Sequence, residues 1–190
     1  MDNNSSLVSA AVSLVDFFEE NNFPYMLAGS IAGIAWGDLN IGSDIEAFIS
    51  VDSFEIPGFI TAIKTKFDML SSDPVRIINK TQSLSLEERT SGIRINLFFA
   101  VLPFEKKAIE RAVELNFSSY MIKICTAEDF ILSKIAQDPD FDMSSIQGII
   151  NNCNLKLDMD YLDLKVKELA GILGSEDIYT RYNEYLNAGY

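Results

Sequence analysis

The chain has 190 residues, of which 15 are Lys or Arg, 28 are Asp or Glu and none is His, so its formal net charge is −13. The lack of His excludes Ser-His-Asp and Cys-His catalysis and the zinc sites that require imidazole. The negative charge argues against a broad nucleic-acid surface, because such binding depends on Lys and Arg. The 48% of hydrophobic residues suffice for a sizeable core.

The first part of the sequence predicts helices that alternate with strands. Apolar residues at helical spacing predict a first helix that ends near Glu20, and Gly29-Ser30 begins a helix of small residues that runs to Trp36. Short apolar or alternating runs predict strands over 23–28 and 44–51. Pro57 stands in the first turn of a further helix, which we expect to continue to Phe67.

The second part of the sequence predicts strands first and helices afterwards. We expect strands over 75–78, 83–86, 93–101 and 120–125, and a helix from Pro103 to Val113. Thr126 to Asp129 forms a capping box, after which the pattern is helical to the end of the chain. The order indicates an α+β protein with a mixed sheet flanked by helices. We expect a core over 1–125 and a C-terminal helical region over 126–190, packed into a single body.

The segment from Leu27 to Ile49 carries the residues with chemical potential. A strand ends in Gly29-Ser30 at a helix start, where free backbone N–H groups and the helix dipole suit a phosphate. Asp44 and Glu46 then alternate on one face of the next strand. Two carboxylates on one face can hold Mg²⁺ that also binds nucleotide phosphates, which predicts metal-assisted phosphoryl or nucleotidyl transfer.

The order and spacing of these residues resemble the minimal nucleotidyltransferases of the DNA polymerase beta superfamily, particularly the bacterial group that includes abortive-infection toxins. The matching positions are Gly29, Ser30, Ala32, Gly37, Asp44 and Glu46, followed by Gly92 to Phe98, Pro103-Phe104 and Thr126 to Lys134. The resemblance implies a nucleotidyltransferase-like fold that transfers a nucleoside monophosphate from a nucleoside triphosphate to an acceptor hydroxyl, with Mg²⁺ or Mn²⁺ as cofactor.

The resemblance also assigns roles to individual residues. Asp44, Glu46 and Lys134 would be catalytic, and Gly29, Ser30, Ser43 and Arg94 would bind the nucleotide. Asp44 and Glu46 would hold the metal, with Asn96 at the position of a third acid and Asp142 as a further acid beyond Lys134.

The sequence departs from the family pattern at four positions. Asn40 replaces Arg, Gly42 replaces Thr, Glu46 replaces Asp and Asn96 replaces Asp. A neutral amide at residue 96 cannot serve as a base for the incoming hydroxyl. A second hypothesis is therefore a degenerate protein that keeps the fold and acts, without catalysis, through a protein partner or a bound nucleotide.

The remaining expectations concern partners and location. We expect a nucleoside triphosphate and an acceptor that the sequence does not name, and no membrane, because the longest apolar run is only Leu97 to Leu102. Tyr179, Tyr182 and Tyr185 form a stripe at helical spacing, for which packing is the favoured interpretation. A homodimer or a protein partner through the C-terminal helices is the alternative. Cys125 and Cys153 indicate reduced thiols in a cytoplasmic protein.

Overall fold

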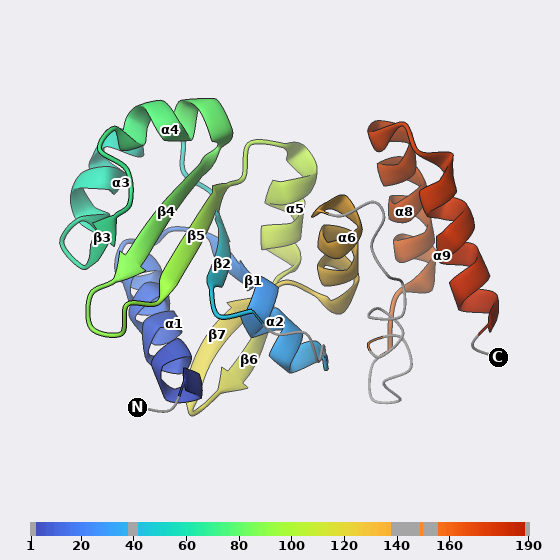
Figure 1. Ribbon diagram of the computed structural model, residues 1–190, viewed down its shortest axis with the longest axis horizontal. Coiled ribbons are helices and arrows are strands. Elements are labelled where there is room, and N and C mark those ends of the chain that lie inside the picture. Colours follow the sequence, from blue (N-terminus) through green and yellow to red (C-terminus); the bar gives the residue numbers. More distant parts are fainter. Residues whose placement is uncertain (1–2, 38–41, 138–148, 150–155, 189–190) are drawn as a thin grey trace. The chain divides into compact units, whose positions relative to one another are not determined.

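The chain forms two compact units in a computed structural model that describes residues 3–37, 42–137, 149 and 156–188 (Figure 1). The first unit comprises residues 1–31 and 42–125, and the second comprises residues 32–41 and 126–190. The first contains all the strands of the described residues, and the second is helical.

A seven-stranded mixed sheet organises the first unit. Its strands lie in the order β3-β4-β5-β2-β1-β7-β6, with β2 parallel to β5 and β1 parallel to β7. All other neighbours are antiparallel. The strands are β1 Tyr25–Ala28, β2 Ile45–Ile49, β3 Phe67–Met69, β4 Ser83–Glu88, β5 Arg94–Phe99, β6 Val113–Phe117 and β7 Tyr120–Ile124.

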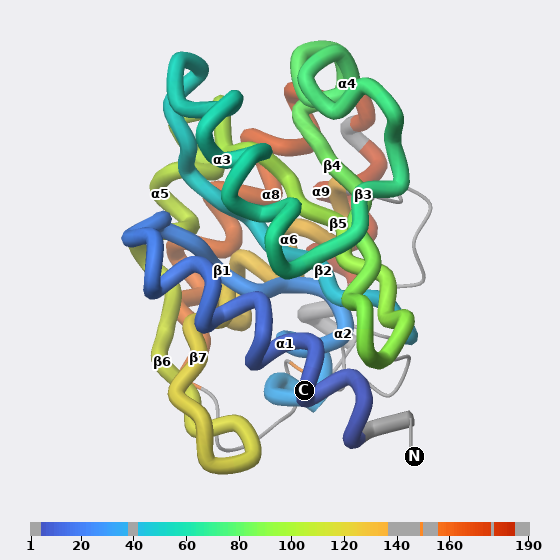
Figure 2. The backbone as a smooth tube through the Cα atoms, turned by 90° about the vertical axis from the view of Figure 1, so that its left-hand side faces the viewer, coloured from blue at the N-terminus to red at the C-terminus, as the bar shows by residue number. Residues whose placement is uncertain are grey.

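Helices lie on both faces of this sheet. The helices of the first unit are α1 Asn3–Glu20, α3 Ile56–Ile63, α4 Pro74–Thr81 and α5 Pro103–Arg111, whereas α2 Gly29–Trp36 begins in the first unit and continues into the second. Figure 2 shows α1 and α3 together in front of the strands, whereas α5 contacts β1 and β2 from the other side (Figure 1). One face of the sheet is therefore buried under α1 and α3, and α5 packs on the opposite face.

Aromatic rings join α1 and α3 to the sheet. The Phe59 ring lies edge-on to Phe17 at 6.0 Å and to Phe99 at 5.5 Å between ring centroids. Phe17 also meets Phe67 of β3 at 6.2 Å. Edge-to-face pairs add stabilisation to the burial of apolar area, so this cluster fixes which face of the sheet is the core.

The structure corrects three local predictions. Residues 75–78, predicted as a strand from their β-branched side chains, belong to α4, because Asp73 caps the helix by accepting from the Arg76 N–H at 3.1 Å and Pro74 occupies its first turn. Phe67 begins β3 and does not continue α3. Val113 begins β6, a strand that the sequence analysis did not predict, because the pattern of α5 continues into it.

Side-chain caps define the second unit, which contains α6 Ala127–Gln137, α8 Met159–Leu173 and α9 Glu176–Ala188. The predicted helix start is confirmed with Thr126 as its N-cap, since Thr126 Oγ1 accepts from the Asp129 N–H and donates to the Asp129 carboxylate, both at 3.1 Å. Asp129 also accepts from the Tyr161 hydroxyl at 2.8 Å, and Glu128 accepts from the Asp158 N–H at 2.7 Å. These acids thus tie the start of α6 to the start of α8.

The tyrosine stripe packs α9 against α8 within the described residues. Tyr182 is buried. This burial is the main cause that raises the pKa of Tyr182 to about 12, and the negative charge of Asp163 is the second cause. The Tyr179 hydroxyl donates to Asp163 at 3.1 Å. These contacts support the packing interpretation for Tyr179 and Tyr182; the side chain of Tyr185 lies outside the described part.

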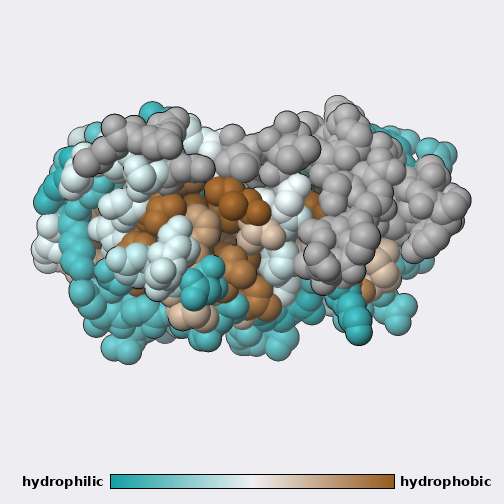
Figure 3. All heavy atoms as spheres, turned by 90° about the horizontal axis from the view of Figure 1, so that it is seen from below, coloured by the Kyte–Doolittle hydropathy of each residue, from teal (hydrophilic) through white to brown (hydrophobic). Residues whose placement is uncertain are grey.

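The architecture confirms the predicted α+β class with a mixed sheet and flanking helices. None of the described helices combines the length and apolarity needed to cross a membrane. The surface is not uniformly charged, since one face carries a group of hydrophobic side chains bordered by hydrophilic ones (Figure 3). Large exposed apolar residues of the described chain include Phe54, Phe104, Met121 and Ile172.

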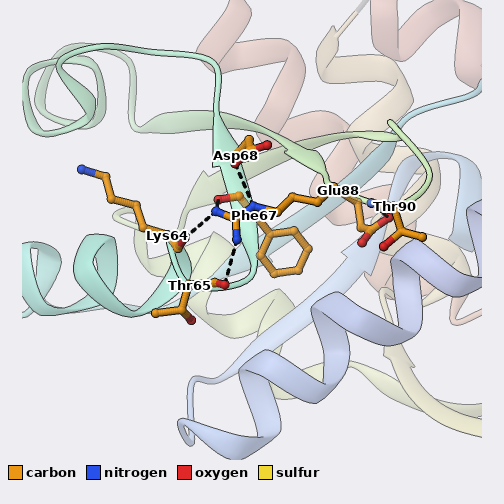
Figure 4. Close-up of polar contacts among 7 residues, drawn as sticks. Lys64, Thr65, Phe67, Asp68, Glu88 and Thr90 are labelled. Carbon is orange, nitrogen blue, oxygen red and sulfur yellow. Dashed lines mark hydrogen bonds and ion pairs between the residues drawn. The ribbon is translucent and has the colours of Figure 1, made fainter.

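Arg89 directly follows β4, and its hydrogen bonds reach β3 and the residues just beyond α3, where Lys64, Thr65 and Asp68 lie (Figure 4). Its guanidinium donates to the carbonyl oxygens of Lys64 at 2.8 Å and Thr65 at 3.0 Å, just beyond α3, and to the Asp68 carboxylate at 2.8 Å. The adjacent Glu88 is buried, and although burial alone raises the pKa of its carboxyl, hydrogen bonds from residues 90 and 91 lower that pKa overall. The planar fork of Arg suits several acceptors at once, so Arg89 holds the edge of the sheet to the helix layer.

We predict that Arg89→Ala lowers the free energy of unfolding by about 1–3 kcal/mol, because it removes charge-assisted hydrogen bonds to carbonyls that end a helix. Arg89→Lys recovers only part of this loss, since an ammonium lacks the fork. Urea denaturation measures both. Arg76→Ala, which removes the same charge from exposed α4, is the control and shifts stability by no more than about 0.5 kcal/mol. Equal effects at residues 89 and 76 contradict the account.

Candidate active site

Gly29 and Glu46 form the tightest contact of the candidate site. Gly29 follows β1 with a backbone φ of +51° and bridges to Ile45 at the start of β2. A Cβ built on Gly29 would lie 2.7 Å from Cδ and 2.8 Å from Oε2 of Glu46. The Glu46 carboxyl group therefore lies directly over the strand-to-helix turn, in space that only glycine leaves open.

Ser30 lies in the first turn of α2, beside the loop that leads into β2. A Cβ built on Gly42 would lie 3.0 Å from Ser30 Oγ, so the chain passes close to this hydroxyl at residue 42. Ser43 and Asp44 follow directly, and Ser43 Oγ donates to the Asp44 carboxylate at 3.3 Å. The predicted phosphate-binding turn and the segment that carries Asp44 are thus neighbours.

Strand pairing places Glu46 and Asn96 side by side. Glu46 is the register partner of Asn96 in the parallel pair of β2 and β5, and Asn96 is the partner of Ser85 in the antiparallel pair of β4 and β5. Ser85 Oγ donates to Asn96 Oδ1 at 2.9 Å. A carboxylate, an amide and a hydroxyl therefore form one row across three strands on the face opposite to the aromatic cluster, which we name the Glu46–Asn96–Ser85 row.

Neighbouring rows on the same face supply charge and aromatic surface. Arg94 of β5 is opposite Glu87 of β4, one step toward Asp44. In the other direction the Phe48 and Phe98 rings stack with centroids 5.1 Å apart. The face therefore offers acids at Asp44, Glu46 and Glu87 and one guanidinium at Arg94.

The remaining residues named by the resemblance are not part of the described first unit. Lys134 belongs to α6 of the second unit, where its ammonium lies 5.1 Å from the centroid of the Phe130 ring. Asn40 and Asp142 lie outside the described residues. The structure thus brings together Gly29, Ser30, Ser43, Asp44, Glu46, Asn96 and Arg94 within the first unit, and the role of Lys134 stays a prediction.

Ser85 and Glu87 were not predicted as site residues. Both predicted strands, 83–86 and 93–101, were correctly placed, and an antiparallel hairpin between them would have aligned Ser85 with Asn96. The signal was the alternation of serines at 83 and 85 with leucines at 84 and 86, which marks one face as polar.

The donor set fits one divalent cation. Mg²⁺ is usually bound by one or two carboxylates together with substrate phosphates and water, and Asp44 and Glu46 meet that requirement. Among the described residues no group of three or more His, Cys, Asp or Glu is arranged to hold a metal ion. Asn96 therefore leaves the site one carboxylate short of a three-acid arrangement.

Comparison with known proteins supports the fold. No protein-family model and no curated protein sequence matches the chain. Among solved structures, an antigenic nucleotidyltransferase-like protein from Paracoccidioides brasiliensis has a TM-score of 0.55 at 16% identity, covering 88% of each chain.

Two further structures are similar over most or all of the chain. The antibiotic-resistance factor ANT(2'')-Ia has a TM-score of 0.55 at 13% identity, covering 100% of this chain and 98% of its own. The lincosamide antibiotic adenylyltransferase LnuA, solved with lincomycin bound, has a TM-score of 0.51 at 13% identity, covering 75% and 96%. The chain therefore has a nucleotidyltransferase-like fold.

We predict that Gly29→Ala lowers the free energy of unfolding by about 1–2 kcal/mol or more, because its Cβ meets the Glu46 carboxyl and the left-handed backbone disfavours L residues. Gly58→Ala is the matched control, because a Cβ on Gly58 of α3 would meet no atom within 4 Å. Alanine favours a helix, so Gly58→Ala leaves stability unchanged or raises it by up to about 1 kcal/mol. Thermal unfolding of the two variants measures the difference, and equal stability contradicts the close packing of Glu46 on Gly29.

Proposed function

We propose that the protein transfers a nucleoside monophosphate from a nucleoside triphosphate to an acceptor hydroxyl. The observation that carries the proposal is the Glu46 carboxyl packed over the Gly29 turn, with Asp44 two residues away. This joins a helix N-terminus suited to phosphate with two carboxylates suited to Mg²⁺. The likeness in fold to a lincosamide adenylyltransferase is consistent with this chemistry.

Each residue of the first unit has a proposed role. The backbone N–H groups at Gly29 and Ser30 bind phosphate oxygens of the nucleotide, and the exposed Arg94 supplies positive charge on the same face. Asp44 and Glu46 hold the divalent cation. When bound, Mg²⁺ neutralises charge that develops on the phosphate oxygens. Ser43 donates to Asp44 and so orients its carboxylate.

The proposed reaction forms a bond between the acceptor oxygen and the α-phosphorus. The bond from that phosphorus to the oxygen that bridges to the β-phosphate breaks, and pyrophosphate leaves with the electron pair. The proton of the acceptor hydroxyl passes to water, because the amide of Asn96 has no basic oxygen to receive it. Lys134 is proposed to pair with the phosphates or with the leaving pyrophosphate.

A second candidate function is nucleotide binding without transfer. The Ser85 hydroxyl donates to Asn96 at 2.9 Å, so the position that resembles a third acid holds a neutral, hydrogen-bonded amide. A protein of this kind would bind the nucleotide and act through a partner. Release of pyrophosphate from a labelled nucleotide in the presence of candidate acceptors separates the two functions.

We predict that the wild-type protein binds at least one of Mg-ATP, Mg-CTP and Mg-GTP in calorimetric titration, and that EDTA abolishes the binding. Asp44→Asn weakens it at least tenfold, equivalent to about 1.4 kcal/mol, because one of two cation ligands loses its charge. Asp52→Asn removes the same charge from the loop after β2 and leaves affinity unchanged. The absence of metal-dependent binding to the wild type contradicts the proposal.

A further inference from the structure

Asn96 is held in a defined orientation beside Glu46. Its Oδ1 accepts the Ser85 hydroxyl at 2.9 Å, and its backbone lies opposite Glu46 in the parallel pair. An amide offers one ligating oxygen, whereas its NH₂ group only donates. Since Ser85 already occupies part of that oxygen, Asn96 is a poor substitute for the two oxygens of a carboxylate.

The charged groups around Asn96 determine how a carboxylate at this position would affect stability and cation binding. Register partners on neighbouring strands lie about 5 Å apart, and like charges at such positions destabilise a sheet by a fraction of a kcal/mol to about 1 kcal/mol. The groups that face this position are Glu46 from β2, Glu87 and Ser85 from β4, and Arg94 from β5. An acid at residue 96 would add to the negative charge of Glu46 and would require a cation beside it.

We propose that Asn96, oriented by Ser85, restricts the site to a single divalent cation that binds together with the nucleotide. This inference rests on the proposed function. Asp44 and Glu46 supply two carboxylates, and the phosphates and water complete the coordination of one ion. Without nucleotide the row carries the single charge of Glu46, so the fold of the wild type does not depend on a cation.

The test counts bound ions. Free Mn²⁺ is measured by electron paramagnetic resonance in the presence of a nonhydrolysable ATP analogue, and the expected result is one Mn²⁺ per protein. Asn96→Asp is expected to bind a second Mn²⁺. Asn79→Asp, which adds the same charge on exposed α4, is the matched control and is expected to bind one.

A second readout needs no nucleotide. The melting temperature of Asn96→Asp is expected to fall below that of the wild type in EDTA and to rise on addition of Mn²⁺, whereas that of the wild type stays within about one degree. For Ser85 as a positioning residue, Ser85→Ala, which frees Asn96 Oδ1 from its hydrogen bond, is expected to raise the number of bound Mn²⁺ ions above one, and Ser85→Thr, which keeps the hydroxyl, to keep that number at one.

The outcomes separate this inference from the proposed function. Two Mn²⁺ ions on the wild type overturn the inference and leave the proposed function standing. No Mn²⁺ on the wild type with nucleotide overturns both. A folded Asn96→Asp variant that binds only one ion also overturns the inference, and if that variant does not fold, the count on the wild type alone still decides.

Discussion

The register of the neighbouring strands β4, β5 and β2 is the constraint on which the candidate site depends. On β2 and β5, the residues that point toward α1 and α3 are buried apolar side chains such as Ile45, Leu97 and Phe99. Because side chains alternate with a period of two, a slip of one residue would place Glu46 and Asn96 in the core and expose this apolar set. The apolar face therefore fixes the position of the polar row, although none of its residues takes part in the proposed chemistry.

The Glu46 side chain fits into the candidate site because Gly29 leaves room for it. The longer glutamate, where the resembling family has aspartate, brings its carboxyl over Gly29, and the space for it exists because Gly29 has no Cβ. The segment that carries Glu46 is strongly acidic, since residues 1–63 contain nine acids and no Lys or Arg. A neutral residue at position 96 limits the negative charge that a bound nucleotide would meet.

The sequence predicted most of the fold because its local signals are strong. The helix start at Thr126 and the strands of the Leu27–Ile49 segment agree with the structure. The predictions failed where two signals competed: β-branched residues at 75–78 suggested a strand, but the Asp73-Pro74 helix start prevailed. Strand pairing is a long-range property, so the sequence pointed to Asn96 as a site residue through family resemblance but did not connect it to Ser85.

The most direct test of the account is a crystal structure of the wild-type protein with Mg²⁺ and a nonhydrolysable nucleoside triphosphate. The account predicts phosphate oxygens at the backbone N–H groups of Gly29 and Ser30, and one cation bound by the carboxylates of Asp44 and Glu46. It also predicts that Asn96 remains hydrogen-bonded to Ser85. A nucleotide bound away from the Gly29 turn, or a cation that touches neither carboxylate, would contradict it.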